Sequence, residues 1–211
     1  MNRRTLLALS LLPLTAQVAA AQPPAALSAR DRADIARVET YLGAMRTLKA
    51  RFLQVGPDGS TTQGTAWIQR PGRMRFEYDP PTPLLLVASH GEGIFQDKQL
   101  GQVSHFPLSS TPLGILLADR ITLSGDVTVV GVDRQPGQLQ VALIRTKSPG
   151  DGSLTLIFAD NPLALRQWTV VDAQQNETRV SLFNMELGGT FDPKLFEFTL
   201  PTNPGGVPRG G

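Results

Sequence analysis

The stretch that most constrains the fold covers residues 63–83, QGTAWIQRPGRMRFEYDPPTP. From Arg73 to Asp79 the side chains alternate, with apolar residues on one side and charged residues on the other. This period of two is typical of a β-strand with one buried face and one solvated face. Arg70-Pro71-Gly72 marks a turn before it. The stretch therefore predicts two neighbouring strands with an apolar face that something must cover.

The first residues predict an export signal, residues 1–21, that is cleaved near Ala21. Arg3 and Arg4 form a basic start, residues 6–14 are apolar, and residues 19–21 are a small-residue cleavage site. The apolar stretch is shorter than the roughly 18 residues that a membrane span requires. The general secretory route and the twin-arginine route both fit this pattern. We therefore expect an exported protein that begins near Gln22.

Composition excludes several classes of protein. The chain has no cysteine, which rules out a lipid anchor on an N-terminal cysteine, a disulfide framework, a thiol nucleophile and a thiolate metal site. About 190 residues remain after cleavage, enough for one domain with a sizeable core. Of the 20 lysines and arginines, 2 lie in the signal, so the mature chain balances 18 basic residues against 18 acidic ones. No nucleic-acid partner is expected.

Two helices are predicted. Ser28 and Asp31 have the spacing of a capping box, and a single apolar stripe follows at intervals of three and four: Ile35, Val38, Leu42 and Met45. A second, short helix is predicted at residues 111–117, TPLGILL, because Thr can cap it, Pro fits its first position and the rest is apolar. Both helices need an apolar surface to lie on.

Short strands separated by turn signals fill the rest of the chain. Besides the two strands of the opening stretch, they are expected at residues 48–55, 84–88, 94–103, 126–133, 138–147, 153–160, 165–172, 177–187 and 197–200. Residues 191–196 predict one helical turn, and residues 202–211 a Pro/Gly-rich tail after a domain covering residues 22–201.

The predicted fold is mainly β, with about ten or eleven antiparallel strands in a curved sheet or open barrel that apolar helices cover. The apolar residues are spread over many strands and few large aromatic side chains are available. This distribution favours a ligand cavity over a filled barrel.

Catalytic chemistry is not indicated. The only histidines, His90 and His105, flank different strand ends and have no carboxylate or serine at a triad or metal-site spacing. The nucleophile elbow, phosphate-binding loop and zinc-helix motifs are missing from the sequence. Glu77 and Asp79 share a strand face with arginines and predict ordinary ion pairs. We expect no enzymatic activity, no metal and no cofactor.

The order of the short motifs is more specific than any one of them. After the amphipathic helix come KARFLQ at 49–54, GTAWIQRPGRMRFEY at 64–78, HGEGIF at 90–95, TPLGILL at 111–117 and FDPKLFEFTLP at 191–201. This order resembles the LolA family of periplasmic lipoprotein carriers over nearly the whole mature chain. The resemblance implies an incomplete antiparallel β-barrel closed by a helical lid. It also implies a periplasmic monomer that takes acylated lipoproteins from an inner-membrane ABC transporter to an outer-membrane receptor.

The resemblance also implies roles for particular residues. Arg70 matches the arginine that fastens the lid by hydrogen bonds to lid backbone, for which a planar fork of donors is suited. The residues implied to line the acyl-chain cavity are Trp67, Met74, Phe76, Ile94 and Phe95. Those implied for the second lid helix are Leu113, Ile115 and Leu116. For each of these, the ordinary alternative is a core side chain, or for Arg70 a surface cation.

Some positions depart from the family pattern, and some alternatives stay open. Met74 and Phe76 stand where bulkier aromatic residues are frequent, and Gly114 should weaken a lid helix by about 1 kcal/mol relative to alanine. The same fold is implied for a lipid-anchored receptor, a lipoprotein-sensing regulator and carriers of other lipids or glycolipids. The missing cysteine disfavours the anchored receptor. An enzyme hidden in the cavity is the third alternative.

Overall fold

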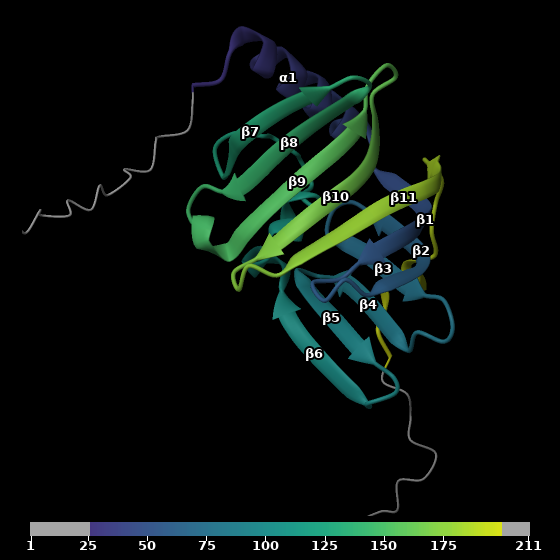
Figure 1. The fold of residues 1–211 in the computed structure, drawn as a ribbon. Coiled ribbons are helices and arrows are strands. Elements are labelled where there is room, and N and C mark those ends of the chain that lie inside the picture. The colour runs from purple at the N-terminus through teal and green to yellow at the C-terminus, as the bar shows by residue number, and fades with distance from the viewer. Residues whose placement is uncertain (1–25, 200–211) are drawn as a thin grey trace, which may run out of the picture.

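The computed structural model describes residues 26–199 (Figure 1). The predicted signal peptide and tail lie outside the described residues. The elements are α1 Ala29–Ala44, β1 Thr47–Val55, β2 Thr61–Gln69, β3 Arg73–Tyr78, β4 Leu84–Ser89, β5 Glu92–Asp97, β6 Gln102–Pro107, the 3₁₀ turns η1 Leu108–Ser110 and η2 Pro112–Ile115, β7 Val127–Gln135, β8 Gln138–Arg145, η3 Pro149–Asp151, β9 Gly152–Ala159, β10 Ala164–Asp172, β11 Glu177–Leu187 and η4 Pro193–Phe196.

All eleven strands belong to one antiparallel sheet, in the order β6-β5-β4-β3-β2-β1-β11-β10-β9-β8-β7. Two meanders, β1 to β6 and β7 to β11, meet where β1 pairs with β11. Within the described range β6 and β7 are the two outer strands and do not pair with each other, so the curled sheet stays open (Figure 1). The prediction of an incomplete antiparallel barrel is confirmed.

The register of the strands decides which side chains share a face. Residues directly opposite each other on antiparallel strands point the same way. Ala66, Phe76, Leu86 and Phe95 stand opposite one another on β2, β3, β4 and β5. Phe76 is only 2% exposed and belongs to the main core. This row therefore lies on the concave face, the one that the covers bury.

Helix α1 forms as predicted and covers part of that face. The Ser28 hydroxyl accepts from the Asp31 N–H at 3.1 Å, and the Asp31 carboxylate accepts from the Ser28 N–H at 2.7 Å. This capping box satisfies backbone donors that have no helical partner. Val38 and Leu42 of the apolar stripe are fully buried. The rings of Tyr41 and Phe158 meet edge to face, with centroids 5.7 Å apart.

The second predicted helix is present as the 3₁₀ turn η2, and another 3₁₀ turn, η1, precedes it. In the link from β6 to β7, the Gly114 N–H donates to the Thr111 carbonyl at 3.2 Å and the Leu116 N–H to the Leu113 carbonyl at 3.0 Å. These bonds span three residues, as in a 3₁₀ helix. Glycine in the middle and the short length of the segment disfavour an α-helix. The short helix predicted at this place is present, as a 3₁₀ turn.

Two predicted strands differ from the structure. Residues 94–103 are not one strand, because the Asp97 carboxylate accepts from the N–H groups of Gln99 and Leu100 and closes a turn between β5 and β6. Residues 197–199 form no strand, and residue 200 lies outside the described range. The helical turn predicted before them is present as η4, which contacts β3 and β4.

Candidate functional site

The concave face holds a cavity of about 410 Å³. It opens beside the β8–β9 and β10–β11 connections, whereas α1 bonds to β7 and to the β9–β10 turn, at the other end of β9 and β10. The apolar lining residues are Phe76, Leu86, Phe106, Pro112, Leu113, Trp168, Val170, Ala173 and Val180. The polar ones are Gln54, Ser110, Thr111, Asp151, Asp172, Gln174 and Thr178. Most of the surface that lines this cavity is apolar, which suits an apolar ligand.

Aromatic rings build the wall between the two meanders. Phe76 and Trp168 pack edge to face, with ring centroids 6.1 Å apart. The ring centroid of Phe52 lies 4.7 Å from that of Phe76 and 5.1 Å from that of Tyr78. The Tyr78 hydroxyl donates to the Gln54 side chain at 2.9 Å. Burial raises the pKa of Tyr78 to about 12, partly offset by this hydrogen bond. The wall therefore stays uncharged at physiological pH.

Arg70 joins both covers. It is 5% exposed, and its Nε donates to the Met45 carbonyl at 2.9 Å, just after α1. Its Nη2 donates to the carbonyls of Leu42 and, at 3.2 Å, Gly43, and its Nη1 donates to the Ala118 carbonyl at 3.3 Å. Burial, then the nearby cation of Arg46, lowers the pKa of Arg70, but a guanidinium stays charged. Helix-end carbonyls lack helical partners and attract cations.

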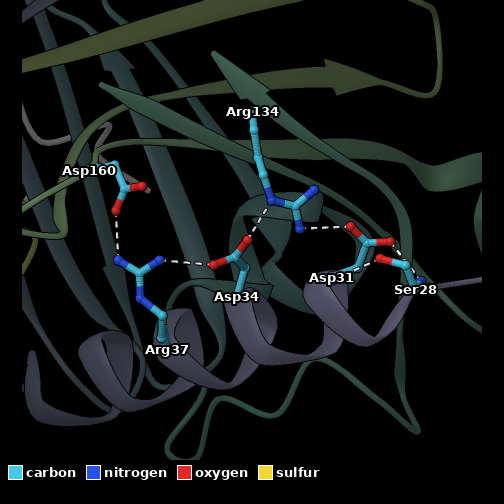
Figure 2. Close-up of polar contacts among 6 residues, drawn as sticks. All are labelled: Ser28, Asp31, Asp34, Arg37, Arg134 and Asp160. Carbon is cyan, nitrogen blue, oxygen red and sulfur yellow. Dashed lines mark hydrogen bonds and ion pairs between the residues drawn. The ribbon is translucent and has the colours of Figure 1, made fainter. Parts of the chain in front are cut away.

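A network of charged groups fastens the other half of α1 (Figure 2). Arg134 of β7 donates to the carboxylates of Asp31 at 2.7 Å and Asp34 at 2.6 Å. Arg37 donates to Asp34 at 2.8 Å and to Asp160, in the β9–β10 turn, at 2.6 Å. Asp34 is thus shared by two guanidinium groups. The network ties α1 to two separate parts of the sheet.

Hydrogen bonds with Ser28, followed by Arg134, lower the pKa of Asp31 from its ordinary 3.8 to about 2. Burial alone would raise the pKa of Asp34, but Arg134 and Arg37 outweigh it and leave that pKa lowered. A carboxyl whose folded pKa is depressed stabilises the fold above its ordinary pKa, and this contribution is lost as pH falls through the folded pKa.

We therefore expect the free energy of unfolding to fall between pH 3.8 and about 2, and to fall less in Asp31→Asn. Urea unfolding over this pH range measures both curves. The matched control is Asp126→Asn, which removes one exposed carboxylate and should follow the parent. Parallel curves for Asp31→Asn and the parent would contradict the assigned role of Asp31.

The chain is similar to proteins of one known family. Residues 43–199 match the family model described as outer membrane lipoprotein carrier protein LolA. The chain belongs to the LolA family. An outer-membrane lipoprotein carrier protein of Methylococcus capsulatus is 31% identical over 78% of this chain and 83% of its own length. One of Azotobacter vinelandii is 28% identical over 81% and 86%. A LolA superfamily structure from Nitrosomonas europaea has a TM-score of 0.44 and 8% identity, covering 78% of this chain and 97% of its own.

Most residues expected for the LolA lid and cavity lie on the concave side. The stripe of α1, Ile35, Val38, Leu42 and Met45, is buried in the core, as are Ile115 and Leu116. Leu113 and Phe76 line the cavity. Met74 is fully buried on the same face, beside Ala88. Phe95 faces the same way by register but does not line the cavity.

The structure contradicts the expected cavity roles of Trp67 and Ile94. Trp67 stands between the buried Ala66 and Ile68 along β2, so it points to the outer face of the sheet. Ile94 is opposite Val87, and both line an outer pocket with Phe196 of η4. The C-terminal segment covers this side. Adjacent residues on a strand face opposite sides of the sheet. Trp67 or Ile94 could therefore face the cavity only if the pairing of its strand were shifted by one residue.

Sequence reasoning missed the half of the cavity that β10 and β11 supply. Trp168, Val170 and Val180 line it together with residues from the first meander. The alternation LRQWTVVD in β10 was a usable signal, because it places Trp168 between polar neighbours. Nothing in the sequence showed that β11 pairs with β1 and so brings Trp168 within reach of Phe76.

Gly114 has a different role from the one expected of it. A Cβ there would lie 2.4 Å from the Leu108 carbonyl oxygen and 2.6 Å from Nη2 of Arg145. The site therefore needs glycine for close approach, and alanine would not strengthen the cover. Gly43, in the exposed last turn of α1, has no atom within 4 Å of such a Cβ.

These two glycines give opposite predictions. Gly114→Ala should lower the free energy of unfolding by more than about 1 kcal/mol, since backbone must move to relieve the overlap. Gly43→Ala, the matched control, should raise it by up to about 1 kcal/mol through helix propensity. Denaturant unfolding of both variants decides the point. An equal gain in both would mean that the cover tolerates a side chain at position 114.

Over residues 26–199, no group of three or more His, Cys, Asp or Glu residues is placed to hold a metal ion. In the same part of the chain, no helix has the length and apolar character needed to cross a membrane.

Proposed function

We propose that the chain is a periplasmic carrier that binds lipoprotein acyl chains in its concave cavity and takes them to the outer membrane. The observation that carries this proposal is an apolar cavity under a cover held by one buried arginine, in a chain of the LolA family. The curated relatives are named for the same task. The lining matches acyl chains, because most of its surface is apolar.

The cover explains how such a carrier could release its ligand. Burying one methylene yields about 0.8 kcal/mol, so a long acyl chain in a rigid, fitted cavity would bind too tightly to be handed on. Here Leu113 of the cover lines the cavity, and its neighbours Ile115 and Leu116 are buried in the core when the cover is closed. Closure therefore competes with the ligand for apolar burial, and the balance sets the affinity.

The rest of the pathway follows from the same proposal. Residues 1–21 are cleaved near Ala21, residues 22–201 form the carrier domain, and residues 202–211 remain as a tail. The partners are acylated lipoproteins, an inner-membrane ABC transporter that releases them and an outer-membrane receptor, and the carrier acts as a monomer. It needs no cofactor and is not an enzyme. Hydrolysis of a panel of acyl esters by the purified protein would contradict the last point.

The test is native mass spectrometry of the protein purified from periplasm with its non-covalent cargo. Triacylated lipoproteins should come off with it, and their yield should rise when the outer-membrane receptor is depleted. Leu113→Glu should lose cargo, whereas the control Leu100→Glu, at a side chain 66% exposed on the β5–β6 turn, should keep it. Recovery of phospholipid or glycolipid without lipoprotein would instead identify a carrier or sensor of another lipid.

A further inference from the structure

We propose that residues 108–118, called the gate below, swing open while α1 stays attached, and that Arg145 holds the start of the gate as Arg70 holds its end. The nature of the ligand rests on the proposed function. The division of the cover into a moving gate and a fixed helix rests on the contacts of each part.

Helix α1 is fastened along its whole length. The charged network joins it to β7 and to the β9–β10 turn (Figure 2). Further along, the Glu39 carboxylate accepts from the Leu123 N–H at 2.6 Å, beyond the end of the gate. Arg70 then binds the last carbonyls of the helix. Moving α1 would break several ion pairs, so this motion is costly.

The gate has no comparable ionic attachment. Its sequence, LSSTPLGILLA, contains no charged side chain. Backbone bonds join its ends to the sheet, from the Leu108 N–H to the Gly91 carbonyl at 2.9 Å and from the Gly72 N–H to the Leu117 carbonyl at 2.8 Å. Arg70 and Arg145 donate further hydrogen bonds to gate carbonyls, and the apolar gate side chains pack in the core. The gate can therefore leave the sheet without separating any pair of opposite charges.

Arg145, the last residue of β8, is the arginine at the start of the gate. Its Nη2 donates to the Leu108 carbonyl at 3.3 Å and to the Thr111 carbonyl at 3.1 Å. Within residues 26–199 no carboxylate pairs with Arg145, and its buried Nε has no acceptor. The gate carbonyls are thus the contacts that hold its guanidinium. Such bonds from a charged donor contribute modestly and can be broken and remade.

Gly114 fits the same arrangement. Nη2 of Arg145 would lie 2.6 Å from a Cβ at this position, so the missing side chain leaves the space through which the guanidinium reaches the gate. Arg145 binds before Gly114, and Arg70 binds Ala118 after it. Thr111, Pro112 and Leu113, between the two arginines, line the cavity. The part of the gate that faces the ligand is therefore the part that the two arginines span.

Spin-label distances test the inference, and a chain without cysteine allows labels at chosen sites. One pair, Ser110→Cys with Gln174→Cys, crosses the cavity mouth at exposed positions. The control pair, Ala36→Cys with Arg166→Cys, joins exposed positions on α1 and β10. Adding a synthetic triacylated lipopeptide should lengthen the distance across the mouth and leave the α1 distance unchanged. Equal lengthening of both pairs would overturn the proposal.

A ligand-free arm makes the result independent of the proposed function. Arg145→Ala should lengthen and broaden the distance across the mouth without changing the α1 pair. Arg145→Lys should recover part of the closed distance, because one ammonium can still donate to both carbonyls. Arg120→Ala, at an exposed arginine, controls for loss of charge. A parent-like mouth distance in Arg145→Ala would refute the role of Arg145.

The two arms separate the possible failures. If the lipopeptide does not bind, the proposed function fails, while the ligand-free distances still decide whether the gate moves alone. If Arg145→Ala does not fold by circular dichroism, Arg145→Lys and the lipopeptide arm decide. An unchanged mouth distance in a protein that has bound lipopeptide would also refute the gate.

Discussion

Replacing Arg70 by leucine is expected to lower the free energy of unfolding by about 3 kcal/mol, because buried carbonyls of α1 and the gate lose a charged donor. Leucine is apolar and shorter, so it offers no hydrogen bond to Leu42, Gly43, Met45 or Ala118. The substitution should destabilise the attachment of α1 and the gate more than it destabilises the sheet. Denaturant unfolding measures the loss, and hydrogen exchange of α1 and of residues 108–118 shows where it falls.

Arg46→Leu is the matched control. Arg46 also reaches the segment after the gate, through the Asp119 carbonyl at 2.7 Å and carboxylate at 3.1 Å. Both side chains are more than half exposed, and exposed pairs contribute about 1 kcal/mol or less. The two arginines thus differ in burial while serving neighbouring parts of the cover. Equal losses in both variants would show that burial of Arg70 is not what matters.

If the proposed function holds, Arg70→Leu should also change the transfer of lipoprotein to the receptor. Without Arg70 the closed state no longer competes as well with bound acyl chains, so the equilibrium shifts toward the loaded, open form. We expect Arg70→Leu to load lipoprotein normally but to pass little of it to the receptor. Transfer is measured with purified carrier, lipoprotein and receptor. Normal transfer by Arg70→Leu would remove the proposed role in release.

Replacing Trp168 by alanine is expected to cost about 3–5 kcal/mol, the usual range for deleting a buried large aromatic side chain. Trp168 is 2% exposed and contacts Phe76 across the join between the two meanders. Its loss would leave a void where the cavity wall is now closed, so the cavity should also enlarge. Urea unfolding gives the stability, and binding of acyl chains of increasing length gives the change in cavity size.

Trp67→Ala is the control on the opposite face. Trp67 is half-buried on the outer side of the sheet, so its removal should cost only about 1–2 kcal/mol and leave acyl-chain binding unchanged. Because these are the only two tryptophans, Trp67→Phe leaves Trp168 as the sole indole, and Trp168→Phe leaves Trp67. A brominated acyl chain should quench only the first of these proteins. Quenching of Trp67 instead would reverse the assignment of the two faces.

Local physical chemistry determined much of this protein from its sequence. The alternation in residues 73–79 predicts a half-buried strand, and Ser28 with Asp31 predicts the start of α1; both are present. These features depend on neighbours in the chain, so the sequence contains their causes. The ordered motifs also led to the family and to Arg70, which turned out to be buried against both covers.

Tertiary structure alone decided which residues meet. Alternation within each strand does not say whether Trp67 and Phe76 lie on the same face of the sheet. The register of β2 with β3 decides this, because it sets Ala66 opposite Phe76 and so places Trp67 on the outer face. Arg134 bonds to Asp31, and Arg145 bonds to the Thr111 carbonyl of the gate. Both contacts join residues that are far apart in the chain. Gly114 was misjudged for the same reason, because the atoms that exclude a side chain there include one from β8. Contacts between distant segments depend on the packing of the whole sheet, which no local pattern records.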